Sequence, residues 1–229
     1  MFGNDEEKRM ILSYQEINNI AQGIVDQYRK KINRPCVNVD ITELLGELYG
    51  LQIEYYSLSK NGAILGLYSS VPVVLYVEHK GEPALVQLQG KTALIDERLL
   101  DDKCIGRRNF TIAHEGSHYI LEHALKEMWI VYRDTFNNEN ITDWSEWQAN
   151  ALASCLLMPE NSIRYMFWRF FSEEHIEIIT PLHRNIYVAF ETMAEYFGVS
   201  KQALGIRLKK LGLVDDVILT ESISIVKEN

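Results

Sequence analysis

Two histidines and a glutamate lie within one short stretch of the chain, His114-Glu115-Gly116-Ser117-His118. On a helix, positions i and i+4 lie on one face with Cβ atoms about 5–6 Å apart, so both imidazoles can reach one metal ion. Zn²⁺ suits such ligands, and a water bound to it ionises near neutral pH. Glu115 lies beside the pair, where it can take a proton from that water. These residues therefore predict a zinc site equipped for hydrolysis, with His114 and His118 as ligands and Glu115 as general base.

The third ligand must come from another element of the chain. One class of zinc site continues the motif as His-x-x-Gly-x-x-His, but this chain has Leu121 and Ala124 at those places, which excludes that class. His123 comes five residues after His118 and points away from the ligand face of the helix. Glu146, on the next predicted helix, is the better candidate. Asn150 lies four residues further on the same face and can hydrogen-bond a ligating imidazole.

Helical periodicity surrounds these residues, and a run of short extended segments precedes them. Ser13 with Glu16 predicts a capping box, and Asp40 and Gly50 predict the two ends of a second helix. The expected helices are 13–31, 41–48, 110–126, 143–157, 161–171, 183–197 and 201–211; the expected strands are 51–56, 63–69, 73–78, 84–88 and 91–95. This order predicts an α+β fold with a small antiparallel or mixed sheet. Residues 91–96 are expected to form an edge strand, where an extended peptide can add to the sheet.

Composition narrows the class of protein. The chain has 229 residues, 47% of them hydrophobic, and a formal net charge of -9. The negative charge disfavours nucleic acid and anionic membranes as partners. The cysteines Cys36, Cys104 and Cys155 are odd in number and form no Cys-x-x-Cys pair, which indicates reduced thiols. No signal peptide or membrane-spanning segment is visible, so we expect a cytoplasmic protein.

The chain resembles the ImmA/IrrE-type metallopeptidases. Residues 108–118 read RNFTIAHEGSH, similar to the family's RxFTxAHELGH, and residues 146–159 read EWQANALASCLLMP, similar to ExxANxFAxxLLMP. A third segment, from Tyr196 to Leu208, also fits, and the resemblance covers roughly 39–213. The departures are Gly116, Ser117 and Leu152, where the family has Leu, Gly and Phe. A glycine inside a helix costs about 1 kcal/mol relative to alanine, so Gly116 indicates close approach of another segment, for which the sheet is a candidate.

The resemblance implies a zincin-like metallopeptidase domain over 11–180 and a helical, helix-turn-helix-like region over 181–229 that packs on it. It also implies Zn²⁺ held by His114, His118 and Glu146, and proteolysis of a regulatory protein, often a repressor. The group that stabilises the tetrahedral oxyanion stays open among several side chains: Tyr119, Tyr132, His123, Tyr165, His175 and His183.

Two other functions compete with proteolysis. Residues 188–211 have the outline of a helix-turn-helix, and the second helix carries Lys201, Arg207, Lys209 and Lys210, as a DNA-binding regulator would. Acidic residues flank that helix, and Leu204 and Leu208 give it an apolar stripe, which favours packing against the core. The other alternative is a zinc-containing interaction protein without catalysis, but structural zinc sites usually have four protein ligands, and only three are expected here.

Overall fold

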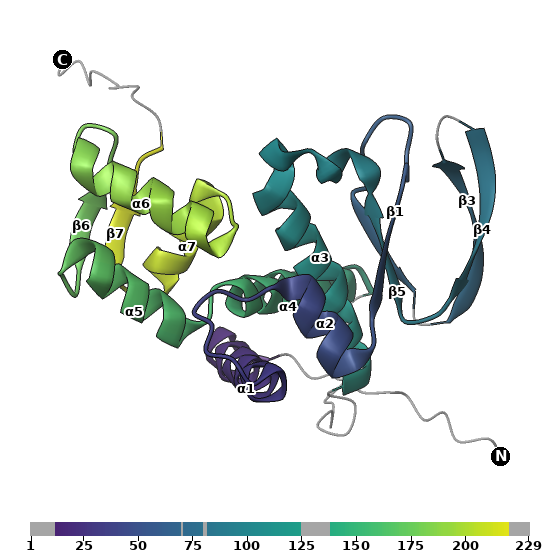
Figure 1. Ribbon diagram of the computed structural model, residues 1–229, viewed down its shortest axis with the longest axis horizontal. Coiled ribbons are helices and arrows are strands. Elements are labelled where there is room, and N and C mark those ends of the chain that lie inside the picture. The colour runs from purple at the N-terminus through teal and green to yellow at the C-terminus, as the bar shows by residue number, and fades with distance from the viewer. Residues whose placement is uncertain (1–11, 70, 80–81, 125–137, 220–229) are drawn as a thin grey trace.

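The computed structural model describes residues 12–69, 71–79, 82–124 and 138–219 (Figure 1). It combines helices with small sheets, which confirms the α+β prediction. The sheet and the C-terminal helices lie at opposite ends of the molecule in Figure 1, and the long helices α1, α3 and α4 lie between them.

The first two helices begin and end where their capping residues predict. Helix α1 spans Tyr14–Ile32, and Ser13 and Glu16 form the expected capping box. Helix α2 spans Ile41–Tyr49, with the Asp40 side chain accepting from the backbone of its first turn. Gly50 ends α2 in the left-handed conformation, with φ 66°, which glycine adopts without the steric cost of a Cβ atom.

The central sheet has three strands, β1 (Gln52–Tyr56), β2 (Gly66–Ser69) and β5 (Thr92–Asp96), in the order β1-β5-β2. Strand β5 pairs parallel with β1 and antiparallel with β2, so the sheet is mixed. The prediction that residues 91–96 form an edge strand is wrong, because β5 is the central strand and is buried along its whole length. Within the described ranges, β1 and β2 are the edge strands of this sheet.

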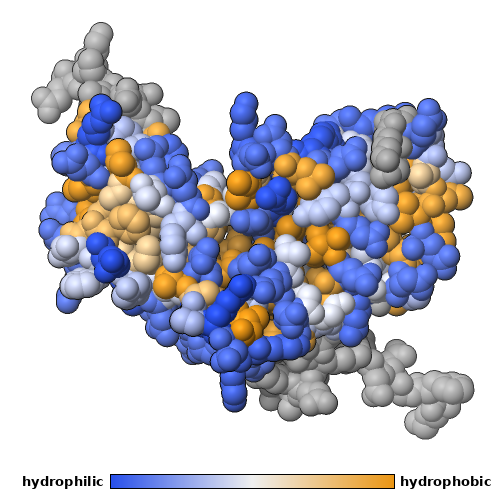
Figure 2. Space-filling model, in the orientation of Figure 1, coloured by the Kyte–Doolittle hydropathy of each residue, from blue (hydrophilic) through white to orange (hydrophobic). Residues whose placement is uncertain are grey.

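Strands β3 (Pro72–His79) and β4 (Glu82–Gln89) form a hairpin that continues the β2–β5 pair in the same register. Between the two pairs of strands, Gly90 and Lys91 have positive φ values of 76° and 50°. The hairpin lies on the side of the sheet away from α3 (Figure 1). Leu94 of β5 is fully buried but does not belong to the main hydrophobic core. The outer face of the hairpin exposes Val74, Tyr76 and Leu85. Figure 2 shows hydrophobic surface at the hairpin end of the molecule.

The helices with the predicted metal ligands start earlier than expected. Two 3₁₀ turns, Glu97–Leu100 and Asp102–Cys104, lead into α3, which spans Ile105–Tyr119 and continues as a π-helical turn over Ile120–Ala124. Helix α4 spans Asn138–Leu157. Helix α3 contacts α4 on one side and α2, β2 and β5 on the others, so it forms the centre of the core.

The C-terminal part contains α5 (Glu160–Phe171), β6 (Ile176–Ile179), α6 (Arg184–Phe197), α7 (Lys201–Lys210) and β7 (Val214–Val217). The short parallel pair β6–β7 was absent from the expected elements. It joins residues on both sides of the predicted boundary at residue 180. Across the described ranges, no helix is long and apolar enough to cross a membrane.

A buried arginine attaches α7 to the rest of the core. Arg207 is fully buried and donates from Nε to the carbonyl of Met158 at 3.0 Å. Its Nη atoms donate to the Tyr14 hydroxyl and to Asn18 Oδ1, both at 2.6 Å. One side chain thereby joins α7, α1 and the end of α4.

Candidate metal centre

The two histidines of α3 and the glutamate of α4 meet between these helices. His114 Nε2 and His118 Nε2 lie 3.1 Å apart. Glu146 Oε2 lies 3.2 Å from His114 Nε2, and Glu146 Oε1 lies 3.3 Å from His118 Nε2. The histidine side chains are largely covered, whereas half of the Glu146 side chain is exposed. The cluster is therefore accessible from the side of α4.

The spacing of these donor atoms fits a tetrahedral metal ion. Ligand atoms bound to Zn²⁺ at about 2.0–2.1 Å and at tetrahedral angles lie about 3.3–3.4 Å from one another. The observed separations of 3.1 to 3.3 Å are close to that value. Two imidazole nitrogens and one carboxylate also form a common donor set of catalytic zinc sites, which leave a fourth position for water or substrate. These three side chains can thus hold a metal ion.

The surroundings of His118 favour the neutral form of imidazole that binds metal. Burial, and then the neighbouring His114, lower the pKa of His118, whereas Glu146 opposes that shift. The ring of His114 has a buried Nδ1 that lacks a hydrogen-bond partner among the described residues. Its Nε2 faces His118 and Glu146, so this nitrogen is the one available to bind a metal ion.

Glu115 lies beside the histidines on the inner side of strand β2. Burial, and then the charge of Glu146, raise the pKa of Glu115 to about 7. A hydrogen bond from the backbone N–H of Tyr68 opposes this rise, because it stabilises the charged carboxylate. A carboxylate whose pKa lies near neutral pH can both accept and release a proton, as a general base must.

Strand β2 approaches α3 so closely that a side chain at Gly66 would collide with it. A Cβ atom there would lie 2.5 Å from Glu115 Oε1, 2.9 Å from Glu115 Cγ and 2.7 Å from Thr111 Cγ2. Gly66 and Tyr68 were missed as site residues in the sequence. The signal available was a glycine inside a strand-like pattern, which often marks close approach of another segment.

The glycine within the metal-binding motif faces a different neighbour from the one expected. A Cβ atom on Gly116 would lie 2.5 Å from Leu45 Cδ1, so helix α2, and not the sheet, takes up the space. Ser117 is buried, and its hydroxyl donates to the carbonyl of Ala113 at 2.7 Å. Gly116 thus serves packing against α2 on a face of α3 away from the histidines, whereas Ser117 bonds to its own helix.

Several other predicted residues do not join the cluster. Asn150 is exposed, and no hydrogen bond from its side chain to either histidine is found in the described part of the chain. Tyr119 is buried against the rings of Tyr49 and Tyr68, while His175 contacts Asp215 and the carbonyl of Gly212. Other candidates for the oxyanion lie elsewhere, Tyr165 on α5 and His183 before α6. Tyr132 and the side chain of His123 lie outside the described residues.

Most of the basic side chains expected on a DNA-reading helix are occupied. Arg207 is buried, Lys201 lies 2.7 Å from Glu191 Oε1, and Lys209 lies 2.8 Å from Asp216 Oδ1. The pair α6–α7 packs on the core instead. At its turn, the backbone of Gly198 accepts a hydrogen bond from Asn109 of α3 at 2.9 Å.

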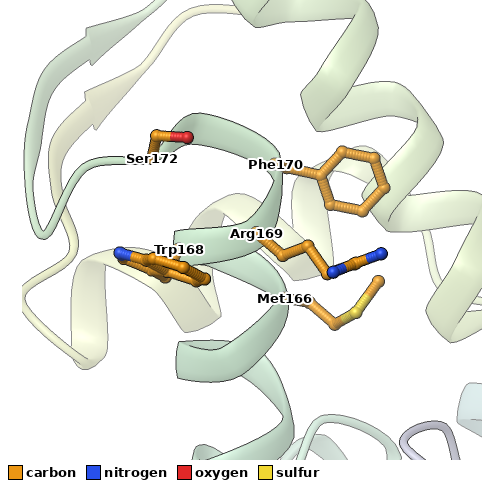
Figure 3. Close-up of a pocket in the computed structure, with 5 residues that line it drawn as sticks. All are labelled: Met166, Trp168, Arg169, Phe170 and Ser172. Atoms are coloured by element: carbon orange, nitrogen blue, oxygen red, sulfur yellow. The ribbon is translucent and has the colours of Figure 1, made fainter.

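Two hollows lie away from the histidines. One, of about 440 Å³, is lined by five residues near the end of α5, and Figure 3 shows Trp168 on the opposite side of the helix from Met166, Arg169 and Phe170. Its side chains therefore do not converge on one point. The other, of about 620 Å³, lies between the start of α2 and the end of α6. It contains both acidic and basic side chains, including Asp40, Glu195 and Arg108.

Known proteins resemble this chain in one sequence segment and in fold. Residues 101–209, which include His114, Glu115, His118 and Glu146, match the model of the IrrE N-terminal-like domain. A solved structure, a Mycobacterium tuberculosis transcriptional regulator, superposes over 85% of this chain with a TM-score of 0.53 and 13% sequence identity. This chain spans 46% of the length of that protein, and the likeness concerns the fold alone. No curated protein sequence matches the chain significantly.

Proposed function

Because residues 101–209 belong to the family of IrrE N-terminal-like domains, we propose that the protein is a zinc-dependent metalloendopeptidase that cleaves a regulatory protein, such as a repressor. The observation that carries the proposal is the convergence of His114, His118 and Glu146 within 3.1 to 3.3 Å, with Glu115 beside them. We further propose that residues 11–180 form the peptidase part and 181–229 a helical region packed on it. The three free cysteines and the formal net charge of -9 support a cytoplasmic location.

Each residue of the cluster has a role in the proposed reaction. His114, His118 and Glu146 would hold the metal ion. When bound, Zn²⁺ polarises a carbonyl and acidifies water. Glu115 accepts a proton from the attacking water as the oxygen of that water bonds to the carbonyl carbon. Glu115 then delivers the proton to the amine nitrogen as the C–N bond breaks. Burial of Glu115 supports this role, because it keeps the carboxylate near the pKa that both steps need.

A substrate peptide would bind along the free edge of β2. The Asp96 N–H donates to the Leu65 carbonyl at 2.8 Å, so in the alternating antiparallel pattern the backbone groups of Gly66 and Tyr68 face away from β5. They face the edge that adjoins Glu115. The Tyr68 N–H donates to Glu115, so an extended peptide adding to this edge would pair with the remaining backbone groups and would place its backbone beside the base and the ligands.

The test combines metal analysis with cleavage assays on the full chain. We expect about one zinc ion per molecule, and cleavage of a candidate repressor that stops when a chelator is added. Glu115→Gln should retain zinc and lose cleavage, because an amide cannot take up the proton. The wild-type protein and Glu47→Gln, a substitution of an exposed glutamate on α2, serve as controls. Cleavage by zinc-loaded Glu115→Gln would refute Glu115 as the base, and a wild-type protein that binds no zinc would refute the metal centre.

A further inference from the structure

We propose that Gly66 is a positioning residue for Glu115, because its missing side chain provides the space in which the edge of β2 holds the Glu115 carboxylate. This inference deepens the proposed function and rests on it for its catalytic consequence. The contact itself, between a strand and a buried carboxylate, can be tested without any cleavage assay.

Close approach on the inner face of β2 is the first observation. A Cβ atom at Gly66 would lie 2.5 Å from Glu115 Oε1 and 2.7 Å from Thr111 Cγ2. Distances below about 3 Å between such atoms do not occur without movement. Even alanine at this position would therefore push the Glu115 carboxylate away, or push β2 away from α3.

The second observation is the hydrogen bond that Glu115 receives from the same strand. The donor is the backbone N–H of Tyr68, two residues after Gly66. The pairing of β2 with β5 turns this N–H toward the free edge, so β5 does not use it. Two contacts with β2 therefore fix the position of Glu115. The N–H of Tyr68, at the edge of the strand, donates to its carboxylate. The backbone of Gly66, which has no side chain, packs against it on the face of the strand.

Together these contacts define where the carboxylate lies relative to the histidines. The side chain of Glu115 has three rotatable bonds and would otherwise sample several rotamers. Helix α3 fixes only its Cα atom. The strand thus supplies the precision that a general base needs, since displacement by about 1 Å can reduce a rate about 100-fold.

The experiment compares Gly66→Ala with Gly46→Ala, a glycine of α2 whose Cβ atom would meet nothing within 4 Å. Bound zinc, the exchange rate of the Tyr68 amide and the cleavage kinetics are measured on each full-length protein. In Gly66→Ala we expect zinc to remain bound, Tyr68 exchange to speed up at least about 10-fold, and kcat to fall about 100-fold with KM changed much less. Gly46→Ala should match the wild type in all of these.

A double-mutant cycle separates positioning from a general effect on the strand. Glu115→Ala should also speed Tyr68 exchange, and adding Gly66→Ala to it should speed exchange little further, because both changes break the same contact. If Gly66→Ala does not fold, Gly66→Ala with Thr111→Ser, which removes the second colliding group, takes its place in the cycle.

Additive effects on Tyr68 exchange, or unchanged exchange in Gly66→Ala with zinc bound, would overturn the proposal. So would unchanged kcat in a Gly66→Ala protein that cleaves substrate. If the wild type cleaves no peptide but exchange at Tyr68 behaves as expected, the proposed proteolysis fails while the positioning of Glu115 by Gly66 stands.

Discussion

Replacing Arg207 with methionine should strongly destabilise the protein. The arginine is fully buried, yet its hydrogen-bond partners at 2.6 to 3.0 Å are a carbonyl, a hydroxyl and an amide oxygen, with no carboxylate among them. Methionine has similar length and packs well, so the change mainly removes three donated hydrogen bonds. It leaves the acceptors of Met158 and Asn18 without that donor.

The magnitude follows from those acceptors. A buried polar group left without its partner costs about 1–3 kcal/mol, so two of them cost about 2–6 kcal/mol. Loss of the desolvated guanidinium returns part of this, because a buried charge is itself unfavourable. We therefore expect Arg207→Met to lower the free energy of unfolding by about 3 kcal/mol.

Urea denaturation followed by circular dichroism measures this change. Lys210→Met on the same helix is the matched control, since Lys210 is exposed and lies over the ring of Tyr14 at 5.5 Å. It should change stability by less than about 1 kcal/mol. If Arg207→Met changed stability as little as the control, the hydrogen bonds of Arg207 would contribute nothing net. The attachment of α7 to α1 and α4 would then rest on apolar packing.

Three further predictions concern metal binding, packing and pH. Glu146→Gln should weaken zinc binding by more than about 100-fold in a chelator competition, since even substitutions around a ligand cost 10–100-fold; unchanged affinity would remove Glu146 from the ligand set. Gly116→Ala should lower the free energy of unfolding by about 1 kcal/mol, because the new Cβ atom collides with Leu45, whereas Gly46→Ala, with open space around it, should raise it by about 0.5–1 kcal/mol; equal signs in urea denaturation would contradict this. The carbonyl of Gly212, and then Asp215, raise the pKa of His175 above its ordinary 6.5. The protonated His175 should therefore stabilise the folded protein fully below about pH 6.5, and this contribution is lost as the pH rises through the raised pKa. The melting temperature of His175→Gln should not show this decrease with rising pH. If the variant and the wild type had the same dependence of melting temperature on pH, the interaction of His175 would be excluded.

Local patterns in the sequence predicted the helix ends and brought together the candidate metal ligands of α3. His114 and His118 are four residues apart, and that spacing alone places them on one face of a helix. The capping residues Ser13 and Asp40 act through contacts within their own first turns, which is why these helix starts were correct. Glu146 required a second helix; its place on the next predicted helix made it the candidate, and the family resemblance implied the same ligand.

Contacts between segments far apart in the chain could not be predicted from the sequence. The position of β5 at the centre of the sheet depends on its parallel pairing with β1, which short links between strands do not suggest. Strands β6 and β7 lie far apart in the chain and are only four residues long each, so neither carries a clear period-2 pattern. Arg207 looked like a DNA-binding side chain because its burial depends on α1 and the end of α4.

Helix α3 packs against α4, α2 and the α6–α7 turn with three different faces, and this packing explains the glycines Gly106 and Gly116. One face directs His114 and His118 toward α4, and Gly116 on another face makes room for Leu45 of α2. Near its start, Gly106 would bring a Cβ atom within 2.8 Å of the backbone at the α6–α7 turn. A side chain at either glycine would press α3 away from its neighbours. The absence of a side chain at Gly116 therefore lets α3 lie close to α2, and substitutions on these distant faces should affect the proposed zinc binding through the position of α3.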